Sequence, residues 1–357
     1  VSYLSLAANQ TLDGQLNLKT DGELKTSGDG QYIGDIELAG GKFSATDNQV
    51  LGGTLSITAD SELTVSQGYT LTLSQNGGLV LGGNTLTISG GGSFVSGSVT
   101  LNNADSKLLL NSITLDSVST TADSLGLDVD ANSTVTALSV GHITPISIAT
   151  GKSLSGAITV TAGSIKLNET GTLASTVTMS GGTLDADKNL TVSGALTQSG
   201  DIAIDVASGK TLSYSGAAIS LGANTITLSG GGSLVSGGLT LNNADSKLLL
   251  NSITLDSVST TADSLGLDVD ANSTVTALSV GHITPISIAA NKTLSGGITV
   301  AAGSLKLNEA GTLVSTIAMS GGTLDADETS TVSGALTQTA DITIDVATGK
   351  TLSYTGA

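Results

Sequence analysis

The chain has 357 residues, with 47 glycines, 2% aromatic residues and no cysteine, and its 30 acidic and 12 basic residues give a formal charge of −18. All basic residues are lysines, so this charge excludes a basic surface for nucleic acid phosphates and opposes binding to an anionic membrane. The lack of cysteine excludes disulfides and thiolate metal sites, and no apolar run is long enough for a membrane-spanning helix.

Internal repetition is the strongest feature of the sequence. Residues 101–149 recur letter for letter at 241–289, which is 140 positions later. The similarity extends to both sides, so 81–220 and 221–357 are two copies of one unit, the second incomplete at its C-terminus, and 1–80 is a diverged partial copy. Repetition of this kind predicts one continuous solenoid rather than separate globular domains.

Short runs in which apolar and polar residues alternate follow one another along the unit, the pattern of half-buried strands. In chain order they fall at 125–129, 134–136, 158–160, 165–167, 177–179, 190–192, 202–206 and 226–228. No helical spacing of apolar residues accompanies them. We therefore predict an all-β fold, an elongated parallel β-solenoid (β-helix) of 140-residue repeats with a core of Leu, Ile, Val and Ala. With coils of about 20 residues, one unit would contain about seven coils and would extend about 34 Å along the solenoid axis.

Segments 182–194 and 223–232 resemble the strand repeats of autotransporter passengers and other large bacterial β-helical adhesins. The resemblance covers nearly the whole chain and rests on composition and rhythm. It implies a secreted, elongated bacterial surface protein, extracellular and structural, and brings no catalytic residues. We expect the shaft of a fibre or adhesin, whose contact with a host or abiotic surface would come from further domains.

Neither end of the sequence has the atypical segment that caps a solenoid. We therefore expect a slice of a longer array that assembles with itself, end to end or side by side.

Oxygen-bearing side chains at alternate positions are candidate ligands for Ca²⁺, which takes six to eight oxygens. They are Asp128, Asp130 and Asn132 in one strand and Asp185 and Asp187 in another. The Gly-containing loops of EF-hands and calcium β-rolls are missing around them. Outward-facing charges that keep the protein in solution are the alternative interpretation.

Three Gly-Lys-Ser/Thr triplets, at 151–153, 209–211 and 349–351, are similar to the end of a phosphate-binding P-loop. Isoleucine stands where that loop requires its first glycine, so we expect plain turns. His142 and its copy His282 are the only histidines. Because no second histidine is nearby in either unit, we expect them at turns rather than in a catalytic or metal site.

Two other functions fit a solenoid. Thr-x-Thr pairs suggest binding to ice or another ordered surface, provided that successive coils place Ser or Thr in the same column; the pairs begin at Thr70, Thr85, Thr134 and Thr225. A polysaccharide-active enzyme would need converging carboxylates beside aromatic side chains, whereas Tyr214 and Tyr354 are isolated in the sequence. We expect no enzymatic activity and no cofactor apart from the candidate calcium.

Overall fold

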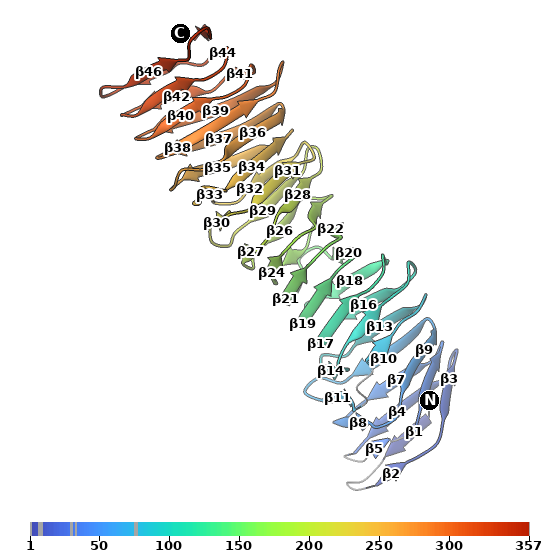
Figure 1. Ribbon diagram of the computed structural model, residues 1–357. Coiled ribbons are helices and arrows are strands. Elements are labelled where there is room, and N and C mark those ends of the chain that lie inside the picture. Colours follow the sequence, from blue (N-terminus) through green and yellow to red (C-terminus); the bar gives the residue numbers. More distant parts are fainter. Residues whose placement is uncertain (1, 6–9, 29–30, 33, 75–77, 357) are drawn as a thin grey trace. The chain divides into compact units, whose positions relative to one another are not determined.

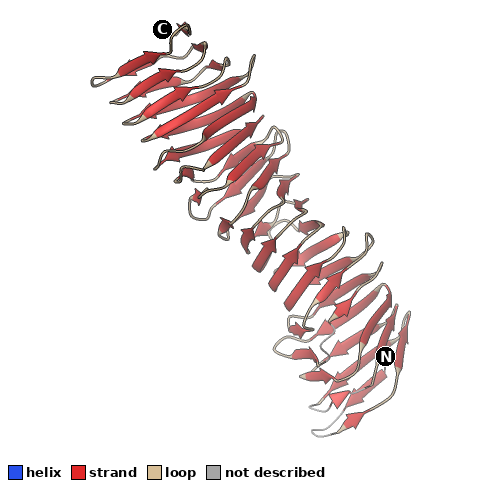
Figure 2. Cartoon of the chain, in the orientation of Figure 1, coloured by secondary structure: helices blue, strands red, loops and turns tan. Residues whose placement is uncertain are grey.

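The computed structural model describes residues 2–5, 10–28, 31–32, 34–74 and 78–356, and these residues form strands and turns without any helix (Figures 1 and 2). No helix in this part of the chain is therefore long and apolar enough to cross a membrane. The chain divides into two compact units, Val1–Thr178 and Met179–Ala357. Each unit is a β-solenoid of parallel, stacked strands, which confirms the predicted fold class. Continuity of the array across residue 178 stays a prediction.

Unit 1 contains three parallel sheets, which we call A, B and C. Sheet A consists of β1 (Ser2–Ser5), β4 (Glu23–Ser27), β7 (Lys42–Ala45), β10 (Ser61–Val65), β13 (Thr85–Ser89), β16 (Lys107–Asn111), β18 (Gly126–Ala131), β20 (Ile143–Ile148) and β22 (Ser164–Leu167). Sheet B consists of β2 (Thr11–Leu12), β5 (Gln31–Tyr32), β8 (Gln49–Leu51), β11 (Thr70–Leu73), β12 (Leu79–Val80), β14 (Ser93–Val95), β15 (Val99–Leu101), β17 (Thr114–Thr120), β19 (Ser133–Val140), β21 (Ser153–Val160) and β23 (Thr172–Leu173). Sheet C consists of β3 (Leu16–Lys19), β6 (Ile36–Ala39) and β9 (Leu55–Ala59). Strand β24 (Thr176–Met179) contains the boundary between the units.

Unit 2 repeats sheets A and B. Sheet A consists of β25 (Thr183–Ala186), β28 (Ile202–Val206), β31 (Thr225–Ser229), β34 (Lys247–Asn251), β36 (Gly266–Ala271), β38 (Ile283–Ile288), β40 (Ser304–Leu307), β43 (Thr323–Ala326) and β46 (Thr343–Val346). Sheet B consists of β26 (Leu190–Val192), β27 (Leu196–Gln198), β29 (Thr211–Tyr214), β30 (Ile219–Ser220), β32 (Ser233–Val235), β33 (Leu239–Leu241), β35 (Thr254–Thr260), β37 (Ser273–Val280), β39 (Thr293–Val300), β41 (Thr312–Leu313), β42 (Thr316–Met319), β44 (Ser330–Val332), β45 (Leu336–Gln338) and β47 (Leu352–Tyr354).

Each coil contributes one strand to sheet A and one or two strands to sheet B. Paired residues in sheet A are 19 positions apart between β16 and β18 and 25 apart between β10 and β13, so coil length varies around the predicted 20. The copy at 221–357 has the seven predicted coils, since seven of its strands, β31, β34, β36, β38, β40, β43 and β46, pair in succession in sheet A. Extra residues lie in the turns, which tolerate changes of length.

The cross-section of the coil changes along unit 1. The early coils have three strands, as in β4, β5 and β6, one for each sheet. Later, two strand positions merge, because β17 pairs with β14 through its first half and with β15 through its second half. Strands β19 and β21 keep this long, merged form.

Buried side chains stack in columns between the sheets, because the side chains on the inward face of successive parallel strands lie in register. One column of unit 1 consists of Leu24, Phe43, Leu63, Ile88, Leu110, Val129 and Ile148. All seven are buried. The core is thus built mainly of Leu, Ile and Val, as predicted, with Phe43 and Phe94 as its fully buried aromatic residues among those described.

The identical segments 101–149 and 241–289 have the same local structure. Strands β16 and β34 have the same burial pattern, and so do β19 and β37. A bulge after Leu110 recurs after Leu250. The two identical segments therefore have equivalent neighbouring residues, as expected of a stack in which each coil contacts only the adjacent coils.

Candidate functional site

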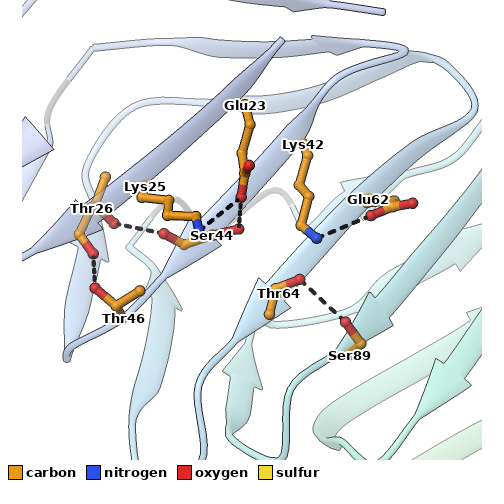
Figure 3. A network of polar contacts seen from close by, with 9 residues as sticks. All are labelled: Glu23, Lys25, Thr26, Lys42, Ser44, Thr46, Glu62, Thr64 and Ser89. Atoms are coloured by element: carbon orange, nitrogen blue, oxygen red, sulfur yellow. Dashed lines mark hydrogen bonds and ion pairs between the residues drawn. The ribbon is translucent and has the colours of Figure 1, made fainter. Parts of the chain in front are cut away.

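A polar network covers the outward face of sheet A near the start of unit 1 (Figure 3). Glu23 Oε1 lies 3.6 Å from Lys25 Nζ and accepts a hydrogen bond from Ser44 Oγ at 3.2 Å. On the next coils, Lys42 Nζ lies 3.3 Å from Glu62 Oε2, and the hydroxyls of Thr64 and Ser89 are 3.2 Å apart. The Glu23–Lys25 pair lies within β4. The other three contacts join neighbouring coils, because residues in the same column of adjacent strands face one another.

The network borders an open hollow of about 510 Å³. Its lining includes Asp21, Glu23, Asp60 and Glu62, with Lys42 between them. Asp60 Oδ1 accepts the backbone N–H of Thr85 at 2.7 Å, so this carboxylate holds the start of the next strand. No aromatic side chain lines the hollow, although sugar-cleaving sites place such side chains against the substrate. Of the carboxylates that line the hollow, those of Asp21, Asp60 and Glu62 are exposed and that of Glu23 is half-buried.

Asn and Asp side chains that accept a backbone N–H of a neighbouring coil form the most regular polar feature of both units. Asn48 accepts from Thr70 at 2.9 Å, and Asn132 accepts from Ser153 at 3.0 Å. The further acceptor and donor pairs are Asp123 with Ile143, Asn189 with Thr211, Asp201 with Thr225, Asp263 with Ile283 and Asn272 with Thr293. Each bond satisfies an amide at a corner, where the ladder of the sheet leaves it without a strand partner. We call these residues the corner caps.

The corner caps were not recognised from the sequence. The signal was an Asn or Asp at the same repeat position in both units, as for Asp123 and Asp263. Asp116 and Asp256 make a second such pair, since their carboxylates accept the N–H groups of Gly97 and Gly237, both at 2.8 Å. Only the structure brings the donor from the neighbouring coil next to the acceptor.

The first group of candidate calcium ligands is already engaged by neighbouring coils. Asp128 Oδ2 lies 2.5 Å from Lys107 Nζ, and the Asn132 oxygen is a corner cap for Ser153. Asp130 is exposed on the same outward face of β18. Among the described residues, no three acidic or histidine side chains are grouped so as to hold a metal ion. Calcium binding here stays a prediction.

The second group lies in unit 2, where Asp185 is half-buried on β25 and Asp187 is exposed in the turn that follows. The equivalent residues 140 positions later are Asp325 and Asp327, at 3.4 and 3.1 Å from Lys306 Nζ. The hydrogen bond to Asp327 is the main reason why the pKa of Lys306 is raised above its usual value. In this copy, a lysine ammonium occupies the position that a cation would take.

The remaining motifs lie in turns. Lys152, Lys210 and Lys350 each donate their N–H to the carbonyl three residues earlier at 2.9 Å, after a glycine with positive φ. His142 Nδ1 lies 3.8 Å from Asp123 Oδ1, and both side chains are exposed; His282 and Asp263 repeat this pair at 3.8 Å. The P-loop-like triplets and the histidines thus occupy the turns predicted for them.

Two of the four Thr-x-Thr pairs share one column. Thr70, Ser93, Thr114, Thr134 and Ser155 are in register on successive strands of sheet B, and the Thr134 and Ser155 hydroxyls are 2.8 Å apart. The pairs at Thr85 and Thr225 lie in sheet A instead, where the next residue in each column is a lysine, Lys107 or Lys247. The condition for an ordered hydroxyl array is therefore met on sheet B only.

The chain matches no protein-family model, no curated protein and no solved structure.

Proposed function

We propose that this chain is a structural, non-catalytic shaft segment of a large extracellular bacterial fibre or adhesin. The supporting observation is the series of corner caps, which connect one coil to the next and recur at equivalent positions in both units. A shaft requires the same rigid contact in every repeat and no unique pocket. Its partners are further copies of itself, while binding to a host or abiotic surface belongs to other domains.

Length is the first test of this proposal. A variant in which residues 81–220 are duplicated in tandem is expected to be longer by about 34 Å, since seven coils each advance by about 4.8 Å. Small-angle scattering and electron microscopy of both proteins measure the difference. An increase in width at constant length would overturn the proposal.

Location is the second test. Antibodies against residues 101–149 are expected to label intact cells of the source organism, and brief protease treatment of intact cells should remove the epitope. Labelling that appears only after lysis would exclude an extracellular shaft.

Binding to ice or another ordered surface is a second candidate function, favoured by the column from Thr70 to Ser155. Inhibition of ice recrystallisation by the wild type, but not by a Thr114→Asp and Thr134→Asp double variant, would support it. Equal activity of the two proteins would exclude this column as the ice-binding surface.

A further inference from the structure

Charged side chains are divided unequally between the two sheets of unit 2. The described strands of sheet A carry Asp185, Asp205, Lys247, Asp268, Asp270, Lys306, Asp325 and Asp345. The described strands of sheet B carry a single charged residue, Asp256, whose carboxylate accepts the N–H groups of Ser236 and Gly237 at 3.0 and 2.8 Å. Unit 1 repeats this division, with Asp116 as the one charged residue on its described sheet B strands. Although the chain has a formal charge of −18, sheet B of each unit is thus nearly uncharged.

The centre of this side is formed by outward residues of the long strands. In unit 1 they are Ser117, Ser119, Ala137, Ser139, Ala157 and Thr159, and we call them, with their counterparts 140 positions later, the sheet B face. Ala137, Ser139, Ala157 and Thr159 are exposed. Val95 and Val235, at the margin, are 37% and 45% exposed, which adds apolar surface.

We propose that the sheet B face binds the sheet B face of a second copy of this chain. This proposal rests on the proposed structural role, and it names the surface through which two copies of the chain associate. Sheets A and B face one core, since the buried side chains of Ile288 and Leu307 in sheet A and of Leu313 in sheet B line the same interior space. Their outward faces therefore point away from each other. Contact through sheet B therefore keeps the carboxylates of sheet A in water and apart from those of the partner.

Two hydroxyl groups of the sheet B face, those of Ser119 and Ser259, already have hydrogen-bond partners. Thr100 Oγ1 lies 3.2 Å from Ser119 Oγ, and Thr240 Oγ1 lies 3.3 Å from Ser259 Oγ, so these groups have hydrogen-bond partners within their own columns. Burying a polar group that keeps a hydrogen-bond partner costs far less free energy than burying one that has no partner. Alanine and glycine between the hydroxyl residues, as at Ala277 and Gly297, let a second sheet approach closely.

A second copy fits this face better than a periodic lattice. The column through Ser117, Ala137 and Ala157 changes residue type from coil to coil, and its counterpart runs Ser257, Ala277, Gly297 and Thr316. An irregular pattern does not match a uniform crystal surface. It does match a two-fold related copy, which presents the same irregular pattern.

The area of the face indicates weak, concentration-dependent pairing. The three long strands of one unit, with seven or eight residues at about 3.3 Å each and stacked at about 4.8 Å, give about 360 Å². A stable complex of standard size buries about 800 Å² on each partner. The face of one unit falls below this area, so we expect weak pairing that depends on concentration.

Sedimentation equilibrium of the full chain tests the proposal. The wild type is expected to form dimers reversibly, and the double variant Ser139→Glu/Ser279→Glu is expected to weaken dimerisation at least about tenfold, because like charges meet across the interface. The matched control is Ser147→Glu/Ser287→Glu, which adds the same charges to the outward face of sheet A. It should change the dissociation constant by less than about twofold. Circular dichroism confirms that all variants are folded.

Cross-linking gives an independent readout, since the chain has no cysteine. Ser279→Cys is expected to form a disulfide-linked dimer under mild oxidation, whereas Ser287→Cys should not form the disulfide. A monomeric wild type at millimolar concentration, equal effects of the two glutamate variants, or ice adsorption by a monomer through this face would overturn the pairing. Scattering separates the two proposals: an elongated particle that stays monomeric contradicts the pairing alone, and a compact particle contradicts the shaft.

Discussion

Asn189 Oδ1 accepts the backbone N–H of Thr211 at 2.9 Å, across 22 positions of the sequence. The equivalent bond near the end of the chain joins the Thr351 N–H to Thr329 Oγ1 and is 3.4 Å long, because threonine replaces asparagine there. The shorter threonine side chain does not reach the amide as closely. One substitution between otherwise similar coils thus changes the strength of a corner cap.

We predict that Thr329→Asn stabilises the last coils and that Asn189→Ala destabilises its own coil, each by about 1 kcal/mol, the usual net value of one hydrogen bond. Exchange of the Thr211 amide with solvent should become about five times faster in Asn189→Ala. Asn189→Asp keeps the acceptor oxygen and is the control. Unchanged exchange in the alanine variant would show that the cap has no stabilising role.

Gly296 and Gly297 make a matched pair with opposite expected outcomes. Gly296 has φ +126°, and a Cβ there would lie 1.8 Å from the Val275 carbonyl oxygen. At Gly297, the nearest atom, the Thr276 carbonyl oxygen, would be at 3.4 Å, and the other copy has Ala157 at this position. We predict that Gly296→Ala lowers the midpoint of thermal unfolding by several degrees and that Gly297→Ala leaves it nearly unchanged. Similar shifts for both would contradict the close approach at Gly296.

Asp35 should make the first coils sensitive to acid. Its pKa is lowered chiefly by the backbone N–H of Thr54, with a further contribution from the Thr54 hydroxyl. Because the folded-state pKa lies below the unfolded value, this contact stabilises the fold above the unfolded pKa and is lost as pH falls through the folded pKa. We predict that exchange of the Thr54 amide accelerates in this acidic range, relative to the intrinsic rate, and that Asp35→Asn, which keeps an acceptor oxygen, removes the effect. An NMR titration of Asp35 with an ordinary pKa would disprove the assignment.

Residues 342–354 repeat the sequence of a coil that is buried earlier in the chain, but the side chains of the repeated strand are exposed. Ile204 and Val206 are 1% and 0% exposed, and β31 pairs with their strand, whereas Ile344 and Val346 are 51% and 39% exposed. Fully burying such a side chain stabilises a protein by about 1.5–3 kcal/mol. We predict that a copy of residues 218–246 fused after Ala357 slows amide exchange in β46 at least about tenfold. A Gly/Ser segment of equal length is the control, and equal rates in both fusions would contradict the prediction.

The sequence by itself determined the all-β class and most strands of the unit. Alternation such as that at Ile202, Ile204 and Val206 recurs in many strands, and period two identifies one buried face without any knowledge of neighbours. The turns at the Gly-Lys triplets were predictable for a similar reason, since glycine permits positive φ locally.

Only the tertiary structure decided which side chains share a column. Coil lengths vary from 19 to 25 residues between paired strands of sheet A. A single period in the sequence therefore cannot predict that Lys107 lies beside Asp128, or that Thr85 and Thr70 lie in different sheets. The corner caps and the division of charge between the sheets depend on the same register. Contacts in a parallel stack join residues about 20 positions apart, and their identity follows from the length of every intervening turn.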